Sequence, residues 1–168
     1  MFKSIVATAT AVALAFSSPA SAKLEALGKV GPWTVAADAE DGKCGMGMQR
    51  DNKVFVISFN ARSMTTTLLF ANKEYADLTG RTIDIVLTVD GKSYNWQAEG
   101  GPGMISVVST DPIVPVELHK AERFALSVNG VGLVGIVSDA EFDSALETVV
   151  KCSFKLNETT SAPSGTAI

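Results

Sequence analysis

The residues best suited to chemistry lie together in the stretch Cys44-Gly45-Met46-Gly47-Met48. On a strand, its three sulfur side chains would point to one face, because side chains alternate along a strand. Thiolates and thioethers are the soft ligands that Cu(I) prefers, and His119, Met64 and Met104 could complete such a site. The alternative is that the methionines fill an apolar core. We favour the core, because a disulfide at Cys44 would leave two weakly binding thioethers.

The catalytic patterns that a sequence can reveal are missing. His119 is the only histidine, no Gly-x-Ser-x-Gly occurs, and Gly91-Lys92-Ser93 lacks the earlier glycine of a phosphate-binding loop. Among 18 acidic residues, no spacing marks a pair for acid–base work. We therefore assign no catalytic residue and no cofactor and favour a protein that is not an enzyme. A small hydrolase that uses unmarked carboxylates remains the alternative.

The composition is that of a folded protein. Of 168 residues, 46% are hydrophobic and 19% are charged, whereas disordered chains combine low hydrophobicity with high net charge. Acidic residues outnumber basic ones by 18 to 14, which argues against a nucleic-acid-binding surface.

Residues 1–22 have the pattern of a cleaved secretory signal peptide. Met1-Phe2-Lys3 is a positive start, the 12-residue run Ile5–Phe16 is largely apolar, and Ala20-Ser21-Ala22 is a small-residue cleavage site. The run is shorter than the about 20 residues of a membrane-spanning helix. We therefore expect a secreted or periplasmic protein without a membrane span, whose net charge changes from −4 to −5 on loss of Lys3.

The only two cysteines, Cys44 and Cys152, allow one pairing within the chain. Disulfides form and persist in exported proteins, so we predict a Cys44–Cys152 bond. Closing a loop of this length would stabilise the fold by about 4–5 kcal/mol in the chain-entropy model. Two free buried thiols are the alternative.

From Gly31 onward, alternating apolar residues separated by turn dipeptides indicate antiparallel β structure. The strongest hairpin is 82–98, because Asp90-Gly91 suits a type I′ turn. A two-residue loop there predicts the pairs Val89–Lys92, Leu87–Tyr94, Ile85–Trp96 and Ile83–Ala98.

A second hairpin is expected to turn at Asn129-Gly130, with Leu126 opposite Leu133 and Phe124 opposite Gly135. Further strands are expected at 44–49, 53–59, 64–70 and 103–110. The stretch 71–80 is a loop or a helical turn, and 116–121 could form a short helix.

The clearest helix is 138–152. Ser138-Asp139-Ala140-Glu141 is a capping box, with Ser138 as the N-cap, and an apolar stripe follows. Cys152 lies at the edge of this stripe, so the disulfide would tie the helix to the strand that carries Cys44. The remaining chain has little to bury, and we expect a disordered tail at 157–168 after a single β-rich domain at 23–156.

These elements predict a mainly β fold, either an antiparallel β-sandwich or a strongly bent sheet with one C-terminal α-helix. Trp33 is expected to follow an N-terminal linker and to bury its ring in the core. The residues assigned to the framework are Trp33, Trp96, Asp90, Gly91, Asn129, Gly130, Ser138 and Glu141.

Three features together resemble the invasion-associated locus B family: Gly31-x-Trp33-x-Val35, Cys44 with Met and Gln49 soon after, and the segment 137–146. The resemblance implies a small exported bacterial β-sandwich with a tryptophan in its first strand and a C-terminal helix. It also implies a binding or envelope-associated role, with no catalytic residues. We therefore expect an exported, non-catalytic binding or envelope-interaction protein, whose protein or envelope ligand the sequence does not identify.

Overall fold

The structure is a computed structural model that describes residues 24–160 except 112, 129–130 and 138. The predicted signal peptide lies outside the described residues. The strands are β1 Leu24–Val30, β2 Trp33–Asp38, β3 Lys43–Arg50, β4 Lys53–Asn60, β5 Thr65–Ala71, β6 Thr82–Val89, β7 Lys92–Gly101, β8 Met104–Ser109, β9 Arg123–Val128 and β10 Val131–Val137. The helices are the 3₁₀ helix η1 Lys73–Leu78, the short α2 Ile113–Lys120 and the long α3 Ala140–Thr160.

The strands form one ten-stranded sheet in the order β1-β2-β3-β4-β5-β8-β7-β6-β9-β10. Every neighbouring pair of strands is antiparallel. With the long helix α3 near the C-terminus, this confirms the prediction of a mainly β, strongly bent sheet with a C-terminal helix.

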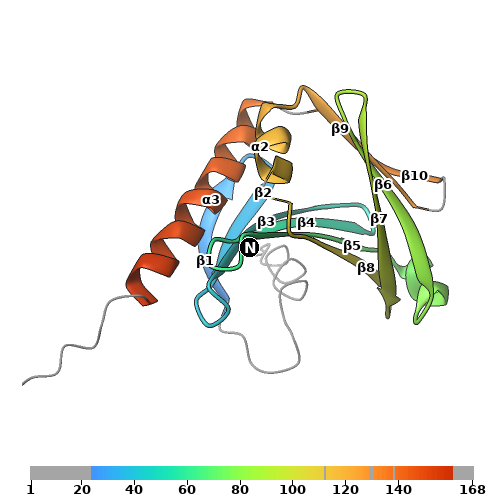
Figure 1. Ribbon diagram of the computed structural model, residues 1–168, viewed down its shortest axis with the longest axis horizontal. Coiled ribbons are helices and arrows are strands. Elements are labelled where there is room, and N and C mark those ends of the chain that lie inside the picture. The colour runs from blue at the N-terminus through green and yellow to red at the C-terminus, as the bar shows by residue number, and fades with distance from the viewer. Residues whose placement is uncertain (1–23, 112, 129–130, 138, 161–168) are drawn as a thin grey trace, which may run out of the picture.

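The sheet bends where β7 passes from one half to the other. β7 pairs with β6 from Lys92 to Glu99 but with β8 only through Gly100 and Gly101. A side chain at Gly100 would collide with the backbone carbonyl of Leu78, so only glycine fits this close approach. As Figure 1 shows, the half made of β6, β7, β9 and β10 therefore stands at a steep angle to the other half, and α3 lies across the β1–β3 side.

The main core fills the space between the two halves of the sheet and the helices. It combines Met46 of β3, Ile85 of β6, Leu118 of α2 and Phe142 of α3, each at most 1% exposed. Trp33 is also in this core, as predicted, and its ring contacts those of Phe55 and Phe142. A smaller cluster on the opposite face of β2, β4 and β5 contains Ala36, Val56 and Leu69.

The β6–β7 hairpin confirms the predicted register. Asp90 and Gly91 have φ angles of 46° and 85°, as a type I′ turn requires. All four predicted pairs occur in the structure. Trp96 is partly buried against the main core and stacks on Tyr94, with ring centroids 6.1 Å apart.

The β9–β10 pairing corrects the second predicted hairpin. Val128 pairs with Val131, but a bulge between Gly132 and Val134 shifts the register by one residue. Leu126 therefore pairs with Val134 and Phe124 with Ile136, so the predicted partners Leu133 and Gly135 are wrong. A bulge adds one unpaired residue to one strand, which turn chemistry alone does not reveal. The predicted turn residues, Asn129 and Gly130, lie outside the described residues.

Both ends of the domain differ from prediction. The expected linker before Trp33 is instead the edge strand β1, paired with β2 from Leu24 onward, so Trp33 lies in the second strand. At the other end, α3 continues past Cys152 to Thr160. The disordered tail predicted from residue 157 is therefore wrong for 157–160, because Leu156 still packs against the core and holds this turn of the helix. Residues 161–168 lie outside the described residues.

The start of α3 corrects the predicted cap. The side-chain Oδ1 of Asp139 accepts hydrogen bonds from the amides of Glu141 at 3.1 Å and Phe142 at 2.8 Å. Its backbone oxygen accepts the first helical bond, from Asp143. Asp139 is therefore the N-cap, one residue after the predicted Ser138, which lies outside the described residues. The Glu141 side chain lies instead against Gly31.

Candidate functional site

An apolar groove of about 300 Å³ lies between α2, α3 and the turn from β4 to β5. The residues that line the groove lie far apart in the sequence. They meet because α2 and α3 pack side by side over the end of the sheet. The groove is lined by Phe59, Met64, Val116, His119, Leu146, Glu147, Val150 and Phe154.

The groove contains several apolar side chains that are exposed to solvent. Among the described residues, Leu27, Met64, Val108, Val116 and Phe154 are the exposed large hydrophobic ones. Three of these line the groove: Met64 at 42% exposure, Val116 at 43% and Phe154 at 44%. Such clustering of exposed apolar groups is typical of a binding surface, whereas isolated ones are ordinary.

The backbone at Met64 is held in an unfavourable conformation beside the groove. Its φ angle of 53° lies in the left-handed region, which costs a residue with a side chain about 1–2 kcal/mol. The preceding turn is fixed by Asn60, whose Oδ1 accepts hydrogen bonds from the amides of Arg62 at 2.9 Å and Ser63 at 3.1 Å. Strain of this kind concentrates at functional sites.

Charged groups on α3 and α2 border the apolar surface. The Glu147 carboxylate accepts a hydrogen bond from Lys151 Nζ at 2.6 Å. This hydrogen bond, the charge of Lys151 and, to a smaller extent, His119 hold the pKa of Glu147 below its ordinary value. On α2, His119 Nδ1 lies 4.0 Å from Asp143 Oδ1. The ionised Glu147 is therefore already paired.

The sulfur side chains considered for copper do not come together in this groove. Met46 is completely buried and Met48 packs against the same core, which confirms the core interpretation for both. Met104 packs against the cluster on the opposite face of the sheet. His119 and Met64 do share the groove. Within the described part of the chain, no group of three His, Cys, Asp or Glu side chains is arranged to hold a metal ion.

A disulfide and a buried hydroxyl fasten α3 beside the groove. Cys44 on β3 is bonded to Cys152 on α3, with 6.0 Å between their Cα atoms, as predicted. The adjacent Ser153 is completely buried. Its Oγ donates to the Phe59 carbonyl at 2.8 Å and accepts from the Ala61 amide at 2.9 Å. These contacts join the helix to the end of β4.

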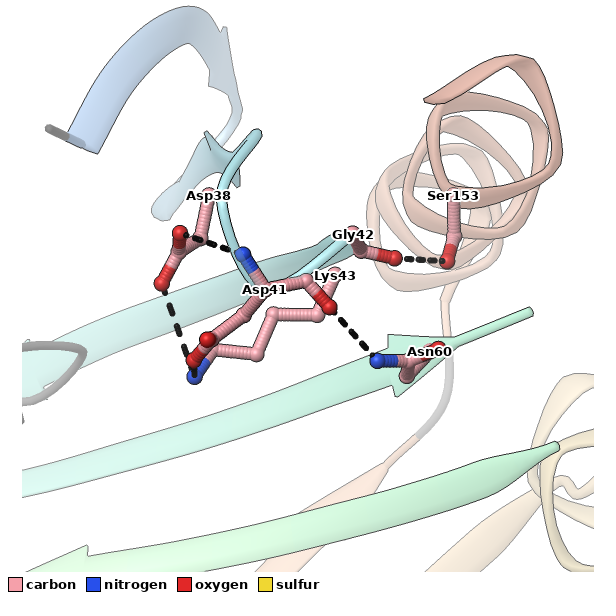
Figure 2. Close-up of polar contacts among 6 residues, drawn as sticks. All are labelled: Asp38, Asp41, Gly42, Lys43, Asn60 and Ser153. Carbon is pink, nitrogen blue, oxygen red and sulfur yellow. Dashed lines mark hydrogen bonds and ion pairs between the residues drawn. The ribbon is translucent and has the colours of Figure 1, made fainter. Parts of the chain in front are cut away.

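Figure 2 shows the polar contacts next to this attachment. Ser153 Oγ also lies 3.4 Å from the Gly42 carbonyl in the β2–β3 turn. Within that turn Lys43 Nζ lies 2.5 Å from Asp41 and 3.5 Å from Asp38. Asn60, at the end of β4, donates to the Asp41 carbonyl at 2.7 Å. The turn, β4 and α3 therefore form one connected network.

His119 was among the candidate residues predicted from the sequence, but the groove that it lines was not predicted. One signal was available: Phe154 follows the buried stripe of α3 and lies off it, because the inward residue at this level is Ser153. A large aromatic residue beside an inward-facing serine marks a second apolar surface on the helix.

No family model matches the chain, and neither characterised proteins nor solved structures give a match. No helix in the part of the chain that the structure describes is long and apolar enough to cross a membrane. The class that the fold defines is a strongly bent antiparallel sheet whose C-terminal helix carries an apolar groove.

Proposed function

We propose that the protein is an exported, non-catalytic binding protein that holds a small apolar group in the groove between α2 and α3. The observation that carries the proposal is the gathering of three exposed apolar side chains, Met64, Val116 and Phe154, in one concave surface. Covering apolar surface gains about 25 cal/mol per Å², so an apolar ligand gains free energy by lying there.

The size and charge of the groove narrow the ligand class. A volume of about 300 Å³ is at the lower end of ligand pockets and fits an alkyl chain or a pair of large apolar side chains. Glu147, the carboxylate among the lining residues, is already paired with Lys151. The part of the ligand inside the groove is therefore uncharged and apolar.

The chemistry of the groove favours binding over hydrolysis. A general acid near neutral pH needs a raised pKa, whereas the pKa of Glu147 is lowered. Glycoside chemistry also needs a second carboxyl group on the other side of the bond, and Glu147 is the carboxylate among the lining residues described. The resemblance to the invasion-associated locus B family implies the same class of function and remains a prediction.

Export is supported by the N-terminal pattern of residues 1–22 and by the disulfide, which suits an oxidising compartment. Fractionation of an expressing bacterium tests this part. We expect the processed chain, beginning near Lys23, in the periplasm or the medium; an unprocessed chain confined to the cytoplasm would contradict it.

Binding can be tested with N-phenyl-1-naphthylamine, a neutral apolar dye that fluoresces when shielded from water. We expect saturable binding of about one equivalent by the exported protein. Phe154→Glu should weaken binding at least tenfold, because it places a charge in the groove. Val108→Glu is the matched control, since Val108 is 61% exposed on β8 and outside the groove. Equal binding by both variants, or none by the parent protein, would refute the proposed site.

A partner can then be sought with the same pair of variants. The exported protein serves as bait on solubilised envelope fractions. A ligand held in the groove should be retained by Val108→Glu and lost by Phe154→Glu. Ligands retained equally by both variants bind elsewhere and would count against the groove.

A further inference from the structure

The bend in the sheet leaves one side of β7 unpaired. β6 pairs with β7 from Lys92 to Glu99, whereas β8 pairs with it only at Gly100 and Gly101. β7 and β8 diverge beyond these two glycines (Figure 1), and no other strand in the described part of the chain joins β7 on that side. β7 therefore has an open edge over most of its length, although it lies in the middle of the strand order.

The backbone groups that this edge exposes belong to alternate residues. In an antiparallel pair, successive residues direct their N–H and C=O groups in turn toward the neighbouring strand and away from it. The Gly100 amide donates to the Arg81 carbonyl at 3.0 Å, on the side of β6. The even-numbered residues of β7 therefore bond to β6, whereas Ser93, Asn95 and Gln97 direct their backbone groups toward the open edge.

The open edge of β7 lacks the features that usually keep a strand edge from pairing with another chain. Proteins protect such edges with bulges, prolines and charged residues. The outermost strands β1 and β10 each contain a break in register, whereas the register of β7 with β6 is unbroken. Residues 93–98 include no proline and no charged side chain. This edge can therefore accept a further strand.

The side chains along the edge alternate in character. Tyr94 and Trp96 pack against the main core, and their stacked rings have centroids 6.1 Å apart. Ser93, Asn95 and Gln97 are exposed and lie on the other face of the strand. A strand that adds to a sheet edge is selected through its alternate side chains, so it should carry apolar residues on one face and polar residues on the other. The segment 93–98 of β7 has this pattern itself.

We infer that the open edge of β7 binds the same edge of a second copy of this chain, in antiparallel orientation, to form a two-fold symmetric dimer. The pairing is centred on Asn95, which lies opposite Asn95 of the second copy, and Ser93 of each copy lies opposite Gln97 of the other. Because these residues direct their backbone groups outward, each such pair exchanges two N–H···O hydrogen bonds. This surface is apart from the groove, and the inference does not rest on the proposed function.

The side chains favour a second copy in this register. Tyr94 of each copy lies opposite Trp96 of the other, and aromatic pairs across neighbouring strands are stabilising. At both ends of the paired segment, the position of Lys92 lies one residue from that of Glu99 in the other copy, so the ends carry opposite charges. Each copy uses the same edge, so the pairing is closed and the assembly stops at two chains.

Sedimentation equilibrium of the exported, oxidised protein over about 1 µM to 1 mM measures this association. We expect the average mass to rise with concentration to twice that of the monomer and no further. Asn95→Pro should weaken association at least tenfold, because proline removes the outward N–H at the centre of the pairing but no N–H that bonds to β6. Asn95→Ala keeps this N–H and is the matched control, which should associate like the parent protein.

An exchange of charges tests the register without the use of proline. Asn95→Lys places two like charges opposite each other at the two-fold axis, and so does Asn95→Asp, so each variant alone should associate at least tenfold more weakly. Mixed in equal amounts, the two variants should associate again as a heterodimer. Far-ultraviolet circular dichroism like that of the parent shows that each variant is folded.

Three results would overturn the inference. The first is a parent protein that stays monomeric over the whole concentration range, which would leave the edge to an extended segment of a different protein. The second is equal association of the proline and alanine variants, or no recovery when the lysine and aspartate variants are mixed. The third is growth beyond two chains, because a closed pairing of β7 with β7 cannot produce it.

Discussion

The buried hydroxyl of Ser153 offers the sharpest test of how α3 is attached. Ser153→Ala removes one oxygen atom at a site that is completely buried. In the structure this oxygen accepts a hydrogen bond from the Ala61 amide at 2.9 Å and donates one to the Phe59 carbonyl at 2.8 Å. Alanine can do neither, so both backbone groups lose this partner at the end of β4.

The expected loss of stability comes mainly from the Ala61 amide, which is left without a hydrogen-bond partner, rather than from the missing hydroxyl itself. Leaving a buried donor unsatisfied costs about 1–3 kcal/mol. The carbonyl adds less, because it has a second lone pair. Since the Ala61 amide is a full backbone donor in a buried place, we expect the free energy of unfolding to fall by about 2 kcal/mol.

Urea denaturation with the disulfide intact measures this loss as a lower midpoint at an unchanged slope. Thr148→Ala is the matched control on the same helix, because Thr148 Oγ1 donates to its own helix, at the Ser144 carbonyl. It should change the free energy of unfolding by less than about 0.5 kcal/mol. If Ser153→Ala proved no more destabilising than Thr148→Ala, the assignment of this hydroxyl as an attachment of α3 would be wrong.

Three further expectations concern the core, the groove and the helix start. Met46→Leu combined with Met48→Leu should lower the free energy of unfolding by under about 1.5 kcal/mol, because the double substitution nearly conserves core volume. Calorimetric Cu(I) titration of the reduced protein should give the same result for this variant and the parent. Loss of one bound equivalent of Cu(I) in the variant would instead support the copper site. Lys151→Met should raise the pKa of Glu147, seen by nuclear magnetic resonance titration, because the hydrogen bond and charge that lower this pKa are removed. Since the lowered pKa favours the folded state above the ordinary glutamate pKa, the stabilisation by this pair should fade as the pH drops through the acidic range, and a titration identical in both proteins would contradict the pairing. Asp139→Ala should lower the free energy of unfolding by about 1 kcal/mol through loss of the N-cap, measured by urea denaturation; no change would mean that another residue caps α3.

The fold could be predicted where local chemistry determines it. Asp90 and Gly91 are suited to one turn type, and a two-residue turn fixes every pair along β6 and β7. No comparable sequence pattern indicates the bulge in β10, because its position depends on how this strand pairs with β9. β1 was missed because Leu24–Val30 is mostly exposed along its length and lacks the alternation by which half-buried strands are recognised.

The groove could not be predicted because it is not a pattern in any one segment. Its residues come from β4, the following turn, α2 and α3, and their meeting depends on how α3 lies on the sheet. The N-cap residue of α3 could likewise not be assigned from the sequence alone. Ser138 and Asp139 are both good caps by type, and only the geometry of the helix start selects Asp139.

The disulfide joins residues 108 positions apart, and this separation sets an order of events during synthesis. Cys44 leaves the ribosome well before Cys152, so its native partner is missing while β4 to β10 emerge. With only two cysteines in the chain, it has no wrong partner within its own molecule. The one mispaired product is a covalent link between two chains, and the hazard grows with the number of chains that emerge side by side. The native bond can therefore form only after α3, which follows every strand in the chain, has been made.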